Sequence, residues 1–146
     1  MFPDLKYYRS IAWDFDETLI KHEKSSLFWQ FIIENPYDQI HHIVTMRSHG
    51  WDKWMWHELR EEGSDLRRDD FREVIALPNR IYESYNKERQ ESGVVHPDHE
   101  YHLFKGLHCK RIGAEVLIDD MESDSVSERG CDVHGIVHFH PDDLTP

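Results

Sequence analysis

The chain is short of cysteine and of basic residues, and it has no long hydrophobic run. Only Cys109 and Cys131 occur among its 146 residues, which fits a reducing compartment, so we expect both to be free thiols. No apolar stretch approaches the roughly 20 residues of a membrane-spanning helix. The opening residues Met1–Lys6 also lack the apolar stretch of a secretory signal. We therefore expect a cytoplasmic protein without a membrane segment.

The shortage of positive charge limits which partners the chain can bind. It carries 17 basic residues against 29 acidic ones, a net charge of −12. Affinity for a nucleic-acid duplex comes largely from Lys and Arg side chains that neutralise phosphates. Extended nucleic-acid binding is therefore excluded, whereas the phosphorylated end of a nucleic acid can still be a substrate.

The apolar pattern predicts the fold class. Short apolar runs alternate with longer helical patterns, as in an α/β protein with a mainly parallel sheet. We expect a single domain, residues 1–146, with a doubly wound, Rossmann-like sheet of about five strands flanked by helices. The expected strands are Ser10–Phe15, Ile40–Met46, Val74–Leu77, Val116–Ile118 and Gly135–Phe139.

Helical patterns fill the segments between these strands. The first begins at Ser25 or Ser26, the next is capped by Ser48, another opens at Pro78, and the last covers Leu103–Ile112. Helical spacing places Trp51, Trp54 and Met55 on a core face, with Trp56 partly exposed. The polar stretch Asn86–Glu100 is expected to be a loop or small insertion, within residues 78–104. Cys131 is expected in a turn, and His138 and His140 on the surface.

Polar side chains that can carry out chemistry follow three of the expected strands. Asp14 and Asp16 follow the first strand, and Thr45 and Arg47 end the second. The fourth strand leads into a further acidic group, which consists of Asp119, Asp120 and Asp124. Ligands bind outside the carboxyl ends of the strands in a parallel sheet. These three distant segments are therefore expected to meet at one edge.

So many acids at one edge require a counter-charge. Two carboxylates about 4 Å apart repel by roughly 4 kcal/mol at an effective dielectric constant near 20. The acids would have to protonate, separate or bind a cation. Mg²⁺ prefers such oxygen ligands and keeps places for water and substrate phosphate. We therefore predict Mg²⁺ as the cofactor.

The order of these motifs resembles that of the haloacid dehalogenase-like (HAD) phosphohydrolases. Asp14-Phe15-Asp16-Glu17-Thr18 resembles the first motif, D-x-D-x-T, and Ile43-Val44-Thr45 resembles the second. In the family and in this sequence, a lysine comes next. The acidic run that begins Asp119-Asp120 and ends at Asp124 resembles the last motif. Lys105 matches the family lysine better than Lys110, which as a mid-helix residue more naturally faces solvent.

The resemblance implies a phosphomonoester hydrolase with an aspartyl-phosphate intermediate. Asp14 would attack phosphorus, and Asp16 would protonate the leaving oxygen and then activate water. Thr45 and Lys105 would hold the phosphoryl oxygens. Thr18 belongs to the same first motif and is included among the substrate-binding candidates.

The resemblance also implies a metal site and a substrate clamp. Mg²⁺ would bind the Asp14 carboxylate, the main-chain carbonyl of Asp16 and an acid of the last motif, for which Asp120 is the first candidate. Asp119 and Asp124 would orient Lys105 and water at the metal. Arg47 resembles an arginine of some nucleotidases and nucleic-acid-end phosphatases, and would clamp a second anionic group.

The substrate and two other functions stay open at the level of sequence. Only about 26 residues separate Thr18 from Thr45, too few for a large cap of the kind that selects substrates in this family. An open site suits a nucleotide or a nucleic-acid-end phosphate, although small phosphomonoesters also fit. The alternatives are a catalytically silent HAD-like binding module and a receiver-type signalling domain. In a receiver the lysine comes last, whereas here Lys105 precedes the late acids.

Overall fold

The computed structural model describes residues 1–146 and contains one parallel β-sheet. Its strands are β1 (Ser10–Trp13), β2 (Ile40–Ser48), β3 (Val74–Leu77), β4 (Val116–Ile118) and β5 (Val137–Phe139). They lie in the order β3-β2-β1-β4-β5, and every neighbouring pair is parallel. The predicted fold class, a doubly wound α/β sheet of five strands, is confirmed.

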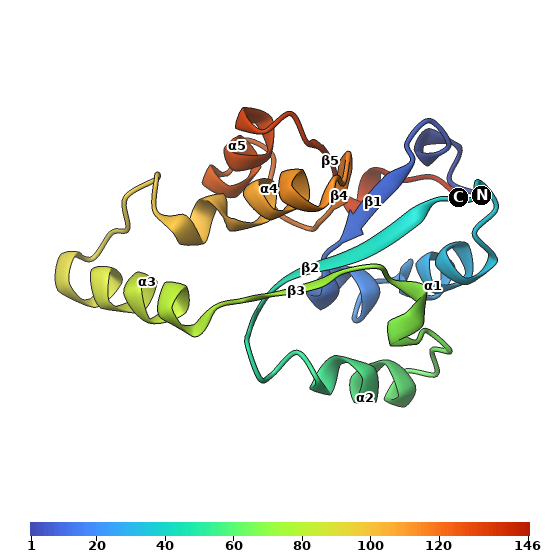
Figure 1. Cartoon of the computed structure of the whole chain (residues 1–146), viewed down its shortest axis with the longest axis horizontal. Coiled ribbons are helices and arrows are strands. Elements are labelled where there is room, and N and C mark those ends of the chain that lie inside the picture. The colour runs from blue at the N-terminus through green and yellow to red at the C-terminus, as the bar shows by residue number, and fades with distance from the viewer.

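Helices cover both faces of this sheet (Figure 1). They are α1 (Ser25–Glu34), α2 (Trp54–Glu61), α3 (Asn79–Ser92), α4 (Glu100–Ile112) and α5 (Val126–Val133). Short helical turns occur at Pro3–Leu5, Phe15–Leu19, Arg68–Asp70 and Pro141–Asp143. Helices α1 and α2 pack on one face, and α4 and α5 pack on the other. No large cap interrupts the sheet, and no helix combines the length and apolar character that crossing a bilayer requires.

Alternation along the strands divides the core between the two faces. Ile11 and Trp13 of β1 pack with Phe28 and Phe31 of α1 in the larger apolar cluster. Ala12, between them in the sequence, belongs to the second cluster on the opposite face. Successive strand residues point to opposite faces, so a strand buried on both sides is apolar throughout. This explains why Ile11–Trp13 of β1 form an uninterrupted apolar run.

The structure corrects several expectations around β2 and α2. Strand β2 runs to Ser48, so this serine does not cap the next helix, which begins only at Trp54. The side chains of Trp51 and Trp54 are 65% and 49% exposed, so their assignment to the core was wrong. Met55 is buried as expected. Trp56 is partly buried and packs beside Phe71. Trp51 precedes α2 and Trp54 is its first residue, so the helical spacing expected for these two indoles does not apply.

The second half of the chain is more helical than the sequence indicated. Helix α3 continues to Ser92, so residues 86–92 of the stretch expected as a loop or small insertion are helical, whereas residues 93–99 form a connection to α4. Polar residues suit this helix because it projects from the body (Figure 1) and buries only Ile81. Helix α5 was not predicted, and it contains Cys131, which the sequence placed in a turn. Both cysteines are free, as expected.

Candidate metal centre

The sheet brings Asp14 and Asp119 together directly. Trp13 and Ile118 are register partners on the adjacent strands β1 and β4, so the next residue of each strand is an aspartate. The Asp14 amide donates to the Ile118 carbonyl at 2.8 Å, and the Asp119 amide donates to the Phe139 carbonyl at 3.1 Å. The chain order reverses between β1 and β4, and such a switch point is where parallel sheets bind ligands.

Three carboxylates meet at this point. One oxygen from each of Asp14, Asp119 and Asp120 lies within 4.8 Å of the others. Asp14 and Asp119 are buried, with 5% and 2% exposure, whereas Asp120 is half-buried. Lys105 of α4 is also buried, and its Nζ donates to Asp14 Oδ1 at 3.0 Å and to Asp119 Oδ2. Of the early and late aspartates that the sequence expected to converge, the structure brings together Asp14, Asp119 and Asp120.

Burial and mutual repulsion act on the charges of this cluster. Desolvation raises the pKa of Asp14 well above its ordinary value, and Asp119 adds to the effect while Lys105 opposes it. Desolvation and the charge of Asp119 also raise the pKa of Asp120. Burial alone would lower the pKa of Lys105, but Asp14 and Asp119 outweigh it and raise that pKa. One lysine faces three carboxylates, so the cluster favours a further positive charge.

These residues fit a divalent cation by their chemistry and arrangement. All three offer carboxylate oxygens, the donors that Mg²⁺ prefers. Asp120 is open to solvent on one side, so water and a phosphate can reach it. Asp119 already accepts a hydrogen bond from Lys105 at one oxygen and one from the Met121 amide, at 2.9 Å, at the other. Asp14 and Asp120 are therefore the better ligands, and Asp119 positions the lysine.

His138 and Glu128 hold the main chain of the loop that follows β4 and carries Asp119, Asp120 and Asp124. His138 Nε2 donates to the Asp119 carbonyl at 2.8 Å, and its Nδ1 contacts Glu128 Oε2. Glu128 Oε1 accepts the Asp124 amide at 2.9 Å. The His138 side chain is only 5% exposed, so placing it on the surface was wrong. It joins β5 and α5 to the loop that carries Asp119 and Asp120.

Asp16 lies outside the three-acid group and pairs with Arg47. Arg47 Nε donates to Asp16 Oδ2 at 3.0 Å, and Nη2 donates to Oδ1 at 2.8 Å. The same guanidinium binds Glu58 of α2 through Nη1, and through Nη2 at 3.1 Å. The hydrogen bonds that Arg47 donates to Asp16 and Glu58 raise the pKa of Arg47 above its ordinary value. In this structure Arg47 therefore contacts two carboxylates of the protein itself.

The two threonines of the predicted site are buried. Thr45 Oγ1 accepts the Arg47 amide at 3.1 Å, which leaves its hydroxyl proton free to donate. The Thr18 carbonyl accepts Ser25 Oγ at 2.7 Å and so ties the turn after β1 to the start of α1. The Thr18 hydroxyl is buried and has no hydrogen-bond partner within the protein.

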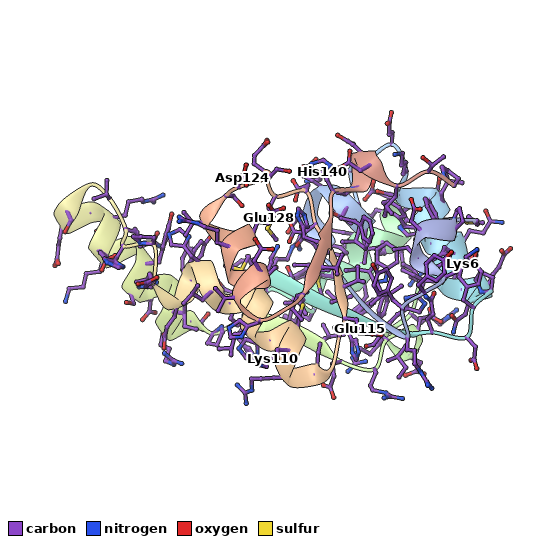
Figure 2. The ribbon with its side chains drawn as sticks, turned by 90° about the horizontal axis from the view of Figure 1, so that it is seen from above. Lys6, Lys110, Glu115, Asp124, Glu128 and His140 are labelled. Carbon is purple, nitrogen blue, oxygen red and sulfur yellow. The ribbon has the colours of Figure 1, made fainter.

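Two candidates lie away from the cluster. Asp124 is exposed, with a left-handed backbone at φ 64°, and is not among the grouped carboxylates. Lys110 is exposed on α4, well away from Asp124 and Glu128 (Figure 2). The structure thus brings Lys105, and not Lys110, to the acids.

Sequence reasoning missed Glu58 and the pair of Glu128 and His138. Glu58 is one of several acids in a polar helix, and nothing in its spacing distinguishes it from Glu61 or Glu62. His138 and His140 alternate to the same face of a short strand, which suggested a surface position. Both contacts depend on helix packing, which the local sequence pattern does not encode.

The comparisons with known proteins support the fold alone. No protein-family model and no curated protein matches the sequence. A crystal structure of an uncharacterized protein from Corynebacterium glutamicum ATCC 13032 Kitasato has a similar fold, with a TM-score of 0.50 and 17% sequence identity. The match covers 90% of this chain and 83% of that chain.

Proposed function

We propose that this protein is a magnesium-dependent phosphomonoester hydrolase that acts through an aspartyl-phosphate. The observation that carries the proposal is the buried group of Asp14, Asp119 and Asp120 around Lys105 at the switch point of the sheet. This arrangement holds one carboxylate, Asp14, beside a fixed positive charge at the edge where ligands bind. The motif order that resembles the HAD phosphohydrolases supports the same reaction.

The first step transfers the phosphoryl group to the protein. A carboxylate oxygen of Asp14 attacks phosphorus, and the ester bond to the leaving oxygen breaks. For this step Asp16 leaves its pairing with Arg47 and takes up a proton from solvent, which it then donates to the leaving oxygen. Lys105 and the free hydroxyl proton of Thr45 stabilise charge on the phosphoryl oxygens. Bound Mg²⁺, held by Asp14 and Asp120, would add positive charge at the phosphate.

The second step restores the protein. Asp16, now a carboxylate, takes a proton from water as the water attacks the phosphorus of the aspartyl-phosphate. The bond between phosphorus and the Asp14 oxygen breaks and releases inorganic phosphate. Asp119 keeps Lys105 in place through both steps by accepting its hydrogen bond. The half-exposed Asp16 can meet both the leaving group and water.

The topology favours this function over a receiver domain. Receiver domains have the flavodoxin-like strand order 2-1-3-4-5, whereas this sheet has the order β3-β2-β1-β4-β5. A silent binding module would need neither a buried nucleophile nor a lysine bonded to it. Both are retained here.

Replacement of the nucleophile tests the proposal. Asp14→Asn should lower Mg²⁺-dependent hydrolysis of an aryl phosphate by more than about 10³-fold, because an amide cannot form the acyl phosphate. The matched control is Asp132→Asn, an exposed acid on α5, which should keep wild-type activity. Circular dichroism checks that both variants fold. Full activity in Asp14→Asn would remove this residue as the nucleophile.

The natural substrate is found by a screen with and without Mg²⁺. The panel contains nucleotides, sugar phosphates, oligonucleotides phosphorylated at either end, and small phosphomonoesters. Nucleotides and nucleic-acid ends enter it because Arg47 follows Thr45 and no large cap covers the site. Hydrolysis that depends on Asp14 is the criterion for a genuine substrate.

A further inference from the structure

The negative charge around Arg47 exceeds the single positive charge of its guanidinium. Its guanidinium forms a two-point pair with Asp16 and also binds both oxygens of Glu58. The Arg47 side chain is only 19% exposed, and its guanidinium carbon lies 4.8 Å from the centre of the Phe15 ring. One positive charge is thus shared by two carboxylates, which leaves the group with a net charge of −1.

The surface beside Glu58 is also acidic. Glu58 lines a shallow hollow of about 260 Å³ together with Ile20, Lys21, Glu61 and Glu62. Three glutamates and one lysine therefore border this hollow. An anion that approached Arg47 from this side would meet repulsion before reaching the guanidinium. It would also have to displace a bidentate carboxylate, which is among the stronger hydrogen-bonded pairs in proteins.

Asp16 shows which part of a substrate this charge would affect. In the proposed reaction Asp16 protonates the leaving oxygen, so the group bonded to that oxygen lies on the side of Asp16 and Arg47. We propose that Glu58 determines specificity by making the leaving-group side of the site reject a second anion. The substrate is then a phosphomonoester whose organic part is neutral or cationic. This inference rests on the proposed function.

This role of Glu58 gives Arg47 a different function from the one that its position in the sequence suggests. Its position after Thr45 suggested a clamp for a second anionic group, as a nucleic-acid end or a nucleoside bisphosphate would need. With Glu58 on the guanidinium, Arg47 instead holds the carboxylate of Asp16 before the reaction begins. Removal of the Glu58 charge should return Arg47 to the role of an anion clamp.

Binding of phosphonates measures this selectivity without any turnover. Three probes share a phosphonate and a chain of similar length, and they differ in the charge at its end: propylphosphonate, phosphonopropionate and aminopropylphosphonate. Calorimetry with and without Mg²⁺ should show that the wild type binds the two probes without a carboxylate about tenfold more tightly than phosphonopropionate, a difference of about 1.4 kcal/mol. Added salt should reduce this ratio by screening the repulsion.

Variants of α2 identify the residue responsible. Glu58→Gln keeps an oxygen that accepts from Arg47 but removes the charge, so the ratio should fall to near one. Glu58→Asp keeps the charge and should retain most of the discrimination. Glu83→Gln removes the same charge from an exposed side chain on α3, outside this hollow, and should keep the wild-type ratio.

Several results would overturn the inference. These are a wild-type ratio near one, no binding of any probe, or a Glu58→Gln ratio equal to that of the wild type. The wild-type ratio alone decides the matter if Glu58→Gln does not fold. Hydrolysis that depends on Asp14, together with a ratio near one, would reject the role of Glu58 alone. Discrimination without such hydrolysis would reject the reaction and retain the anion selectivity.

Discussion

Lys105 is the residue on which the charge balance of the buried acids depends. Lys105→Met should destabilise the protein by about 3 kcal/mol, because removing one partner leaves Asp14 and Asp119 buried without a counter-charge. Mg²⁺ should recover part of this loss by supplying positive charge to the same acids. Urea denaturation with and without Mg²⁺ measures both effects. Lys110→Met, on the exposed face of α4, is the matched control. An equal change in both variants would contradict the assignment of Lys105.

Asp16 should matter most for substrates with poor leaving groups. A positioned acid contributes about 10²–10⁴-fold when the leaving oxygen needs a proton. Asp16→Asn should therefore slow hydrolysis of an alkyl phosphate by about 10²-fold or more, and that of an activated aryl phosphate much less. Kinetics on such a pair of substrates measure the difference. Equal losses on both would reject the role of Asp16 as the acid.

At the scale of single residues, the sequence predicted which residues lie at the edge of the sheet better than it predicted which side chains they contact. The meeting of Asp14, Asp119 and Lys105 follows from strand ends and one helix, so it could be expected. The pairing of Asp16 with Arg47 could not, because it depends on how the turn at Phe15–Leu19 directs the side chain. That turn places Glu17 at φ 58°, a left-handed conformation that the sequence does not predict for a glutamate. Glu58 completes the pair from a helix whose packing was equally hidden.

The crossing of α4 and α5 depends on two glycines. A Cβ on Gly106 would lie 2.4 Å from the Gly130 carbonyl oxygen, whereas a Cβ on Gly130 would lie 3.3 Å from its nearest neighbours. Gly106→Ala should destabilise the protein by about 1–3 kcal/mol, the usual cost of forcing extra volume into a packed interior. Gly130→Ala is the milder companion and should cost less. Thermal denaturation ranks the two, and equal stability of Gly106→Ala and the wild type would contradict this packing.

Elements were predicted best where they are buried. The strands β3 and β4 have the predicted bounds, because short apolar runs flanked by polar residues leave little choice. The length of α3 and the presence of α5 were misjudged because each helix buries few side chains: Ile81 alone in α3, and only Gly130 and Cys131 in α5. Without an apolar stripe, a solvent-facing helix resembles a loop in sequence. The exposed Trp51 and Trp54 gave the opposite error, since large indoles suggest a core.

For the molecule as a whole, a buried histidine in the sheet should make stability depend on pH. His41 Nδ1 accepts the Trp13 indole N–H at 3.0 Å, so a second ring proton would face a donor. Desolvation, with a smaller contribution from His42, lowers the pKa of His41 to about 4. In the unfolded chain the pKa is about 6.5. The stabilisation is therefore complete above pH about 6.5 and is lost progressively as the pH falls toward about 4.

The expected loss over this window is about 3 kcal/mol. Urea denaturation at a series of pH values measures it. His41→Gln cannot titrate, so its free energy of unfolding should change less over the same window, even if it starts lower. A free energy of unfolding that does not change between neutral pH and the lower end of the window would contradict this role of His41.

The architecture was accessible from sequence because few α/β topologies suit five short apolar runs with helices between them. The edge that binds ligands then follows from the parallel strands. The strand order needed the structure, because the sequence does not state on which side of β1 the chain places β2 and β4. That order, β3-β2-β1-β4-β5, is what sets Asp14 directly beside Asp119.

The central claim is that Asp14 and Asp120 bind one divalent cation, with Asp119 beside them holding Lys105. Crystals grown with Mn²⁺, which takes the same oxygen ligands as Mg²⁺, allow the ion to be located by its anomalous scattering. The account predicts a single strong peak among these three carboxylates, and its loss in Asp120→Asn. A peak at another site, or none at this one, would contradict it.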